Sequence, residues 1–338
     1  MHELRKDPLL NRWVTVLDYS LGPKDYIRKV TKRQEESGPC KFCEGKEAET
    51  PPEIVALRKE NSTPNGPGWH ARVIPNPKPI LRIEGSLDRQ GVGIYDRMNS
   101  IGANELIIES PEHDKRAEDY GPEQVKRILM LYQMRLSDLE KDPRMRYVFI
   151  CKNSGRGSGA LYSHPHSEIT AMPIIPKLLK DELDSAKQYY AYKERCIFCD
   201  IINEELRTGQ RVITITSHFV AFCPYAPKLP FEFWIIPRRH HCAFQDMRAD
   251  EIEDLSLLLT DMLRKLRSLL EESPFHYVLH TAPNRIPRRD HWHTLGDDYH
   301  WHIEFTPRLV RASGVEWGSE FYVLTTSPED AAKYLKEA

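Results

Sequence analysis

Two histidine-rich motifs and two cysteine pairs are the parts of this sequence best suited to chemistry. The histidine motifs have the form His-x-His-x-Glu and occupy His164–Glu168 and His300–Glu304. The cysteines are paired as Cys40 with Cys43 and Cys196 with Cys199. The Cys-x-x-Cys spacing places two thiolates on one tight turn, and it is typical of zinc sites. We therefore expect chemistry that combines metal binding with a reactive histidine.

Each cysteine pair has histidines available to complete a four-ligand metal shell. The first predicted site consists of Cys40, Cys43, His113 and His164, and the second of Cys196, Cys199, His240 and His300. His241 competes with His240 for the second site. A redox dithiol or a pair of buried cysteines is the alternative, but a thioredoxin-like motif expects a βαβ context that this sequence lacks. We predict two zinc ions per chain.

The first histidine motif also contains a candidate nucleophile. A strand over residues 163–169 would place His164, His166 and Glu168 on one face, because side chains alternate along a strand. One histidine is then available to a metal while its neighbour faces a substrate. Neutral imidazole attacks phosphorus, and the phosphoramidate that it forms still leaves readily. We predict that His166 is the nucleophile; the alternative is that it is another metal ligand.

A glycine-rich segment, Asn153–Gly159, precedes this motif. Small residues allow backbone N–H groups to approach phosphate oxygens closely, which suits a phosphate cradle. An ordinary flexible loop has the same composition.

The elements that position these residues occur twice in the same order. In each half a Cys-x-x-Cys pair is followed by an apolar strand, a histidine, an amphipathic helix, a second strand and the His-x-His-x-Glu motif. The expected strands are 105–109, 146–150, 233–236 and 277–280, and the expected helices are 123–140 and 252–266. We predict an α+β fold of two tandem domains, residues 1–185 and 186–338, each an antiparallel sheet with a packed helix.

Composition excludes several classes of protein. The 338 residues carry a formal net charge of −2, which provides no overall field to attract nucleic acid or an anionic membrane. No apolar stretch approaches the roughly 20 residues of a membrane span, and Met1–Leu10 lacks the apolar segment of a secretory signal. Seven cysteines are too few for a disulfide scaffold in a chain of this length. We expect a soluble cytoplasmic protein.

At these motifs the chain resembles the galactose-1-phosphate uridylyltransferase family, a branch of the histidine triad superfamily with two such domains in one chain. The resemblance spans nearly the whole length, and His164-Pro-His166 is its most specific motif. The other motifs are Arg5–Pro8, Asn11–Val14, Cys40–Cys43, Arg72–Ile74 with Asn76, Ser110–His113 and Asn153–Gly155. The second half is similar to the ADP-glucose phosphorylase branch through Cys196–Cys199, Pro237, His240, His300-Trp301 and Gly314–Gly318.

The resemblance implies roles for individual residues. It makes His166 the nucleophile of the catalytic site and Cys40, Cys43, His113 and His164 a zinc site. It makes Asn76 and Asn153 nucleotide contacts, together with Ser154, Gly155 and Ser163, and it places Glu316 and Gly318 near a sugar phosphate. It further implies a homodimer that acts on nucleotide sugars and sugar phosphates in galactose and carbohydrate metabolism.

The sequence departs from the family pattern at two places. Glu168 stands where the family usually carries Gln, and a carboxylate repels a phosphoryl group unless it is protonated or paired with a cation such as Arg156 or Lys152. The segment Asp18–Lys24 has one lysine where arginines are expected.

Three hypotheses follow from the motifs and these departures. The first is transfer of a nucleoside monophosphate, UMP, between a nucleotide sugar and a hexose 1-phosphate through nucleotidyl-His166. The second keeps this chemistry with phosphate or water as the acceptor, as in an ADP-sugar phosphorylase or a nucleotide hydrolase. The third is an inactive zinc-stabilised nucleotide-binding protein.

Overall fold

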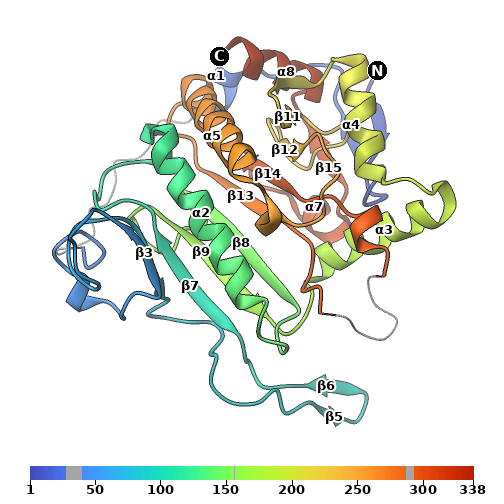
Figure 1. Cartoon of the computed structure of the whole chain (residues 1–338). Coiled ribbons are helices and arrows are strands. Elements are labelled where there is room, and N and C mark those ends of the chain that lie inside the picture. The colour runs from blue at the N-terminus through green and yellow to red at the C-terminus, as the bar shows by residue number, and fades with distance from the viewer. Residues whose placement is uncertain (28–39, 156, 287–292) are drawn as a thin grey trace.

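The computed structural model describes residues 1–27, 40–155, 157–286 and 293–338. Its centre is a ten-stranded antiparallel sheet in the order β10-β11-β12-β14-β13-β8-β9-β7-β4-β3 (Figure 1). These strands are β3 (Val55–Arg58), β4 (Trp69–Pro75), β7 (Ala103–Ile108), β8 (Tyr147–Ser154), β9 (His166–Met172), β10 (Val212–Ile215), β11 (Phe219–Phe222), β12 (Phe233–Pro237), β13 (Phe275–His280) and β14 (His302–Pro307). The predicted α+β class is confirmed.

The two halves of the chain meet edge to edge in this one sheet. Strand β8 of the first half pairs with β13 of the second half, with Lys152 opposite Tyr277. Outward from this junction the strands run β8-β9-β7-β4-β3 on one side and β13-β14-β12-β11-β10 on the other. The repeated order of elements therefore appears in space as two similar half-sheets joined into one. The expected boundary at residues 185/186 falls inside helix α3 (Lys177–Lys193).

Helices α2 (Pro122–Leu139) and α5 (Ala249–Leu270) cover one face of the sheet, as Figure 1 shows. Their apolar residues fall at helical spacing, and those predicted to share a face, such as Leu129 and Leu255, are buried in the main core. Burying each such side chain contributes about 1.5–3 kcal/mol. Helix α2 begins with a proline, whose fixed φ suits a first turn, and α5 has Asp250 and Glu251 in its first turn, where they complement the helix dipole.

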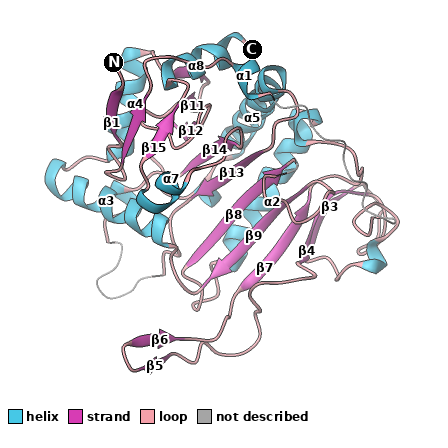
Figure 2. Ribbon diagram, turned by 180° about the vertical axis from the view of Figure 1, so that it is seen from behind, coloured by secondary structure: helices cyan, strands magenta, loops and turns pink. Residues whose placement is uncertain are grey.

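The opposite face of the sheet is partly covered by α3 and α7 (Figure 2). His166 and Glu168 point to this face, because side chains alternate along a strand and Ile169 and Ala171 of β9 pack in the core with α2. The remaining helices are α1 (Pro23–Tyr26), α4 (Ile197–Thr208), α6 (Leu295–Asp298), α7 (Gly314–Ser319) and α8 (Pro328–Glu337). A three-stranded sheet contains β1 (Glu3–Lys6), β2 (Trp13–Val16) and β15 (Tyr322–Leu324), and a projecting hairpin contains β5 (Gln90–Val92) and β6 (Tyr95–Arg97). Among the described residues, no helix is both long and apolar enough to cross a membrane.

Candidate active site

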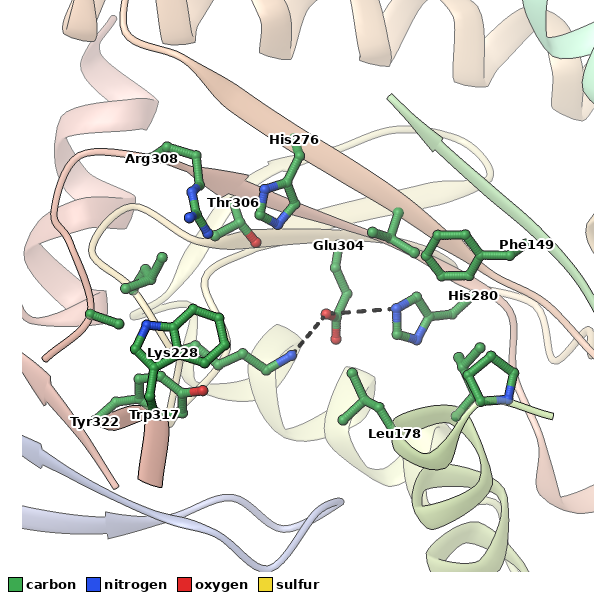
Figure 3. A pocket seen from close by; sticks show the side chains of 15 residues that line it. Phe149, Leu178, Lys228, His276, His280, Glu304, Thr306, Arg308, Trp317 and Tyr322 are labelled. Carbon is green, nitrogen blue, oxygen red and sulfur yellow. Dashed lines mark hydrogen bonds and ion pairs between the residues drawn. The ribbon is translucent and has the colours of Figure 1, made fainter. Parts of the chain in front are cut away.

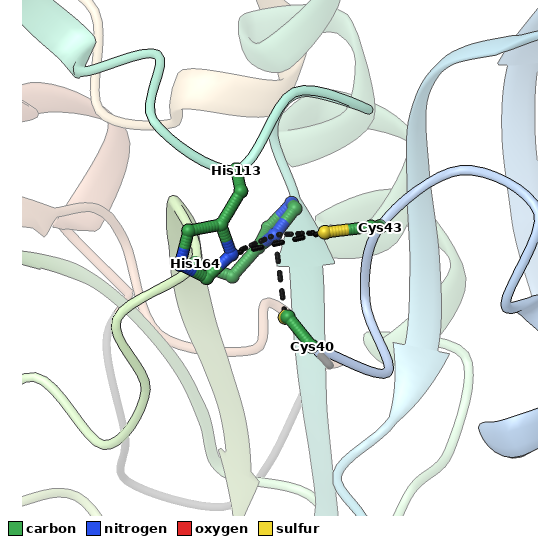
Figure 4. A group of neighbouring side chains, drawn as sticks. All are labelled: Cys40, Cys43, His113 and His164. Atoms are coloured by element: carbon green, nitrogen blue, oxygen red, sulfur yellow. Dashed lines mark hydrogen bonds between the residues drawn. The ribbon is translucent and has the colours of Figure 1, made fainter. Parts of the chain in front are cut away.

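The four residues predicted for the first metal site lie together between β9, the loop after β7 and the turn of the cysteine pair (Figure 4). The Cys40 Sγ lies 3.6 Å from the His164 Nδ1, and the Cys43 Sγ lies 3.8 Å from the Nδ1 atoms of both His113 and His164. The two Nδ1 atoms are 3.4 Å apart. His164 donates its Nε2–H to the carbonyl of Ser110 at 2.7 Å, which leaves the Nδ1 lone pair directed at the thiols.

These separations fit a tetrahedral zinc ion. With Zn–N bonds of about 2.1 Å and Zn–S bonds of about 2.3 Å, neighbouring ligand atoms of a tetrahedron are about 3.4–3.8 Å apart. The distances among Cys40, Cys43, His113 and His164 span this range. Two thiolates and two imidazoles form a closed shell, which is the pattern of a structural site.

The second predicted group is also assembled. The Cys199 Sγ lies 3.4 Å from the His240 Nδ1 and 3.7 Å from the His300 Nδ1, and Cys196 completes the set. His240 donates from Nε2 to the carbonyl of Gly296, whereas His241 accepts a hydrogen bond from the Trp301 indole outside the group. The geometry therefore selects His240 over His241.

His166, the first residue of β9, is buried and held in one tautomer. Its Nδ1–H donates to the carbonyl of His164 at 2.8 Å, so the Nε2 carries the lone pair. The Nε2 is buried and has no hydrogen-bond partner among the described residues. Burial, together with the nearby charge of Lys152, outweighs the hydrogen bond to the His164 carbonyl and holds the pKa of His166 below its usual value, so the ring is neutral at physiological pH. A neutral imidazole with an unpartnered Nε2 lone pair is the form of histidine that acts as a nucleophile.

A cavity of about 550 Å³ opens beside His166. Its wall includes the glycine-rich loop, in which Gly155 has φ of +82° and a Cβ atom would lie 3.0 Å from the Cα of Pro274. Only glycine fits both constraints without strain. The residues predicted for nucleotide binding that line this cavity are Asn153, Ser154, Gly155 and Ser163.

The strand predicted over residues 163–169 begins only at His166, as β9. His164 therefore lies in the turn before the strand, where it reaches the thiols.

The structure places three other predicted residues away from this cavity. Asn76 is buried at the end of β4, where its amide donates to Asn104 at 2.9 Å. The Glu316 carboxylate caps α7 by accepting from the backbone N–H groups of Ser313 and Val323. Gly318 is exposed on the same helix. Within one chain, these residues do not line the His166 cavity.

A buried ion pair supports β9 from the helix side of the sheet, and sequence reasoning missed it. The Lys152 ammonium contacts the Glu109 carboxylate at 2.5 Å and the His166 carbonyl at 3.4 Å. Glu109 also accepts from the Ser167 hydroxyl, which lies 2.5 Å from the hydroxyl of Tyr132 on α2. Lys152 is thus a positioning residue for the strand that carries the nucleophile. The only signal in the sequence was a lysine and a glutamate within apolar strands.

Replacing Lys152 by methionine is expected to lower the free energy of unfolding by about 3–5 kcal/mol, because it leaves the Glu109 carboxylate buried without its cation. The double variant Lys152→Met/Glu109→Met removes both charges and should recover most of this loss. Urea denaturation of the three proteins measures the effect. A double variant as unstable as the single one would show that the pair is not the source of the stability.

Comparison with known proteins agrees with these motifs. Sequence models of the N-terminal and C-terminal domains of galactose-1-phosphate uridyl transferase match residues 84–176 and 182–319. ADP-glucose phosphorylase of Arabidopsis thaliana is 32% identical over 99% of this chain and 92% of its own length. The chain belongs to the galactose-1-phosphate uridylyltransferase family. This is a family of nucleotidyltransferases.

Two further members extend the comparison. The galactose-1-phosphate uridylyltransferase of Thermotoga maritima is 26% identical over 100% of this chain and 98% of its own length. The crystal structure of the Arabidopsis thaliana ADP-glucose phosphorylase with bound ADP-glucose is 31% identical, has a TM-score of 0.82, and covers 100% of this chain and 99% of its own. The fold of this uridylyltransferase family therefore extends over the whole chain.

Glu168, the departure from the usual glutamine of the uridylyltransferase family, is half-buried on the same strand as His166. Its Oε1 accepts a hydrogen bond of 3.4 Å from the Asn153 amide, and burial raises the pKa of the carboxyl group above its usual value. Lys152 does not pair with it, because that ammonium binds Glu109 on the other face of the sheet. Arg156 lies outside the described residues. Protonation, assisted by burial, is the compensation that the described residues support.

The Glu168→Gln variant is expected to retain or increase nucleotidyl transfer, by up to about tenfold. The wild-type carboxyl group ionises as the pH rises through its raised pKa, and the resulting charge repels the phosphoryl group. The ratio of variant to wild-type kcat should therefore increase with pH. Steady-state assays over a pH series measure this ratio, and Glu168→Asp, which keeps the charge, is the control. A large loss of activity in Glu168→Gln with unchanged folding would instead give the carboxylate a positive role.

The second His-x-His-x-Glu motif has a different environment. His302 donates its Nδ1–H to the carbonyl of His300 at 3.2 Å, as His166 does to that of His164. Its Nε2, however, faces carboxylates, with Glu304 at 3.7 Å and Glu182 at 3.8 Å, and the Trp234 ring stacks on it. Glu182, His280 and His302 form a third group whose ligand atoms lie within 4.8 Å of one another. Sequence reasoning missed Glu182, since a glutamate within a charged helix carries no signal.

Proposed function

We propose that this chain transfers a uridylyl group between a nucleotide sugar and a hexose 1-phosphate through a covalent nucleotidyl-His166 intermediate. The observation that carries the proposal is the buried, unpartnered Nε2 of His166, fixed in its nucleophilic tautomer at the wall of a cavity. The same cavity has the glycine-rich loop, whose backbone suits phosphate oxygens.

In the first step, the Nε2 of His166 forms a bond to the α-phosphorus of the nucleotide sugar. The bond from that phosphorus to the oxygen shared with the β-phosphorus breaks, and the hexose 1-phosphate leaves with the electron pair. The His164 carbonyl, which accepts the Nδ1–H, stabilises the positive charge that develops on the ring. In the second step a phosphate oxygen of another hexose 1-phosphate attacks the same phosphorus and releases His166.

The two Cys/His groups support a content of two zinc ions per chain. Zinc at the first group would fix the turn through Cys40, Cys43, His113 and His164, and thereby orient the backbone from which His166 projects. We further propose a cytoplasmic homodimer. Glu316 and Gly318 lie outside the His166 cavity of their own chain, and a partner subunit is the remaining route by which they would approach a sugar phosphate.

A second candidate is the phosphorolysis of ADP-glucose, with phosphate as the acceptor. It is favoured by the 32% identity to ADP-glucose phosphorylase over 99% of the chain, against 26% for the Thermotoga maritima uridylyltransferase. The His166 chemistry is the same in both cases, and only the base and the acceptor differ.

Substrate assays distinguish these candidates. The purified protein is incubated with UDP-glucose and galactose 1-phosphate, and separately with ADP-glucose and inorganic phosphate, and the nucleotide products are resolved by chromatography. We expect ping-pong kinetics with the first pair. Turnover of only the second pair would establish the phosphorylase, and release of UMP or AMP without an acceptor would establish a hydrolase. Absence of turnover with either pair would leave a nucleotide-binding protein.

A further inference from the structure

A second cavity, of about 370 Å³, lies where the second half of the chain adjoins β8 and the start of α3 (Figure 3). It is formed by β8, β13 and β14, by the start of α3, and by α7 with the segment that follows it. Glu304 on β14 faces into it, as Figure 3 shows, and the register of the duplicated strands makes Glu304 the counterpart of Glu168. The same register makes His280 the counterpart of Asn153.

This cavity cannot repeat the chemistry of the His166 cavity. The counterpart of the nucleophile, His302, is fully buried beneath the Trp234 ring and beside the Glu182 carboxylate. It does not line the cavity. The cavity of the second half therefore lacks the counterpart of the nucleophile.

The polar side chains of the cavity carry an excess of positive charge. The Lys228 ammonium lies 3.5 Å from the Glu304 carboxylate, which is also 3.7 Å from the His280 ring. Arg308 is exposed at the mouth beside His276, and its guanidinium forms no ion pair within the described part of the chain (Figure 3). Among the lining residues two cations thus face one carboxylate; behind the lining, the Glu182 carboxylate lies 2.8 Å from the His280 ring and the Glu232 carboxylate interacts with Lys228. The free guanidinium is available to an anion.

The remaining wall is mostly apolar. Phe149, Leu179 and Val278 line it, as does Trp317, which is 72% exposed. Cavities that combine apolar walls with a few convergent polar groups are the usual sites of small organic ligands. The cavity volume of about 370 Å³ is sufficient for a ligand with a single ring and an ionised substituent.

We propose that this cavity binds a small organic anion, a carboxylate or a phosphate monoester with an apolar body. The anionic group pairs with Arg308 at the mouth and with Lys228 farther in, and the apolar body packs against Phe149 and Val278. The site shares no lining residue with the His166 cavity of the same chain, and it requires no particular outcome for the proposed transfer reaction.

Binding of three related probes tests the site: benzoate, phenyl phosphate and the neutral benzyl alcohol, titrated into the full chain by calorimetry. We expect saturable binding of at least one anion and at least about tenfold weaker binding of benzyl alcohol. Preference for benzoate would identify a carboxylate site, and preference for phenyl phosphate a phosphate-ester site. Arg308→Gln should weaken anion binding about tenfold, whereas Arg311→Gln, an exposed arginine of the same segment that does not line the cavity, should not.

A competition experiment separates this site from the His166 cavity. UDP-glucose and ADP-glucose at saturating concentration should not displace the bound anion, and His166→Ala should bind it unchanged. The proposal is overturned if neither anion binds below about 10 mM, if Arg308→Gln and Arg311→Gln have equal effects, or if a nucleotide sugar displaces the anion competitively.

Discussion

Replacing His166 by alanine is expected to reduce kcat for nucleotidyl transfer by about 10⁴-fold or more, because the variant lacks the nitrogen that forms the covalent intermediate. The imidazole of His166 is not one of the four ligands of the neighbouring Cys/His group, so metal content should remain unchanged. Its Nδ1 bond to the His164 carbonyl is local, and the fold should persist. Steady-state kinetics, elemental analysis and circular dichroism of the variant measure these three expectations.

His302→Ala is the matched control, since it makes the same change at the equivalent position of the second half. His302 is buried among Trp234, Glu182 and Glu304, so its loss should affect stability more than chemistry. We expect a folded His302→Ala protein to retain kcat within about tenfold. If this variant lost more activity than His166→Ala while remaining folded, the active half would have been assigned wrongly.

Replacing Cys40 by serine is expected to remove one of two zinc ions and to lower activity by about 10–100-fold or more. The variant lacks one of the two thiolates, and its remaining ligands are Cys43, His113 and His164. Because His164 precedes the nucleophile by two residues, loss of the ion releases the turn that sets the position of His166. The free energy of unfolding should fall by about 4 kcal/mol or more, as expected when a structural metal is lost.

Cys196→Ser provides the comparison, because it should also remove one ion per chain but at a site remote from His166 in sequence. We expect this variant to lose stability and to retain more activity than Cys40→Ser. Mass spectrometry under native conditions counts the ions, and urea denaturation measures stability. If wild-type protein purified without chelator contained no metal, neither Cys/His group would be a zinc site.

Much of the site was predictable because its chemistry is local in sequence. A Cys-x-x-Cys turn brings two thiolates together wherever it occurs, and the motif at His164–Glu168 places a ligand and a nucleophile two residues apart. The helices that pack on the sheet were also predictable, since the apolar spacing of 123–140 and 252–266 agrees with α2 and α5 to within a few residues.

The features that were not predictable depend on contacts between distant segments. Pairing of β8 with β13 joins the two halves into one sheet, and strand composition does not encode which edges meet. The ion pair of Lys152 and Glu109 required knowing that β8 and β7 flank β9. The role of Glu316 as a helix cap was also hidden, because a capping box and a ligand contact can use the same residue type.

The most direct test of the central claim is to find the covalent intermediate. The protein is mixed with UDP-glucose, and separately with ADP-glucose, each radiolabelled in the α-phosphate, without an acceptor, and is then denatured and digested. We predict label on the peptide that contains His166, stable in base and lost in acid, as expected for a phosphorus–nitrogen bond, and absent from His166→Ala. Turnover of either substrate with no labelled peptide, or label on a residue other than His166, would contradict the account.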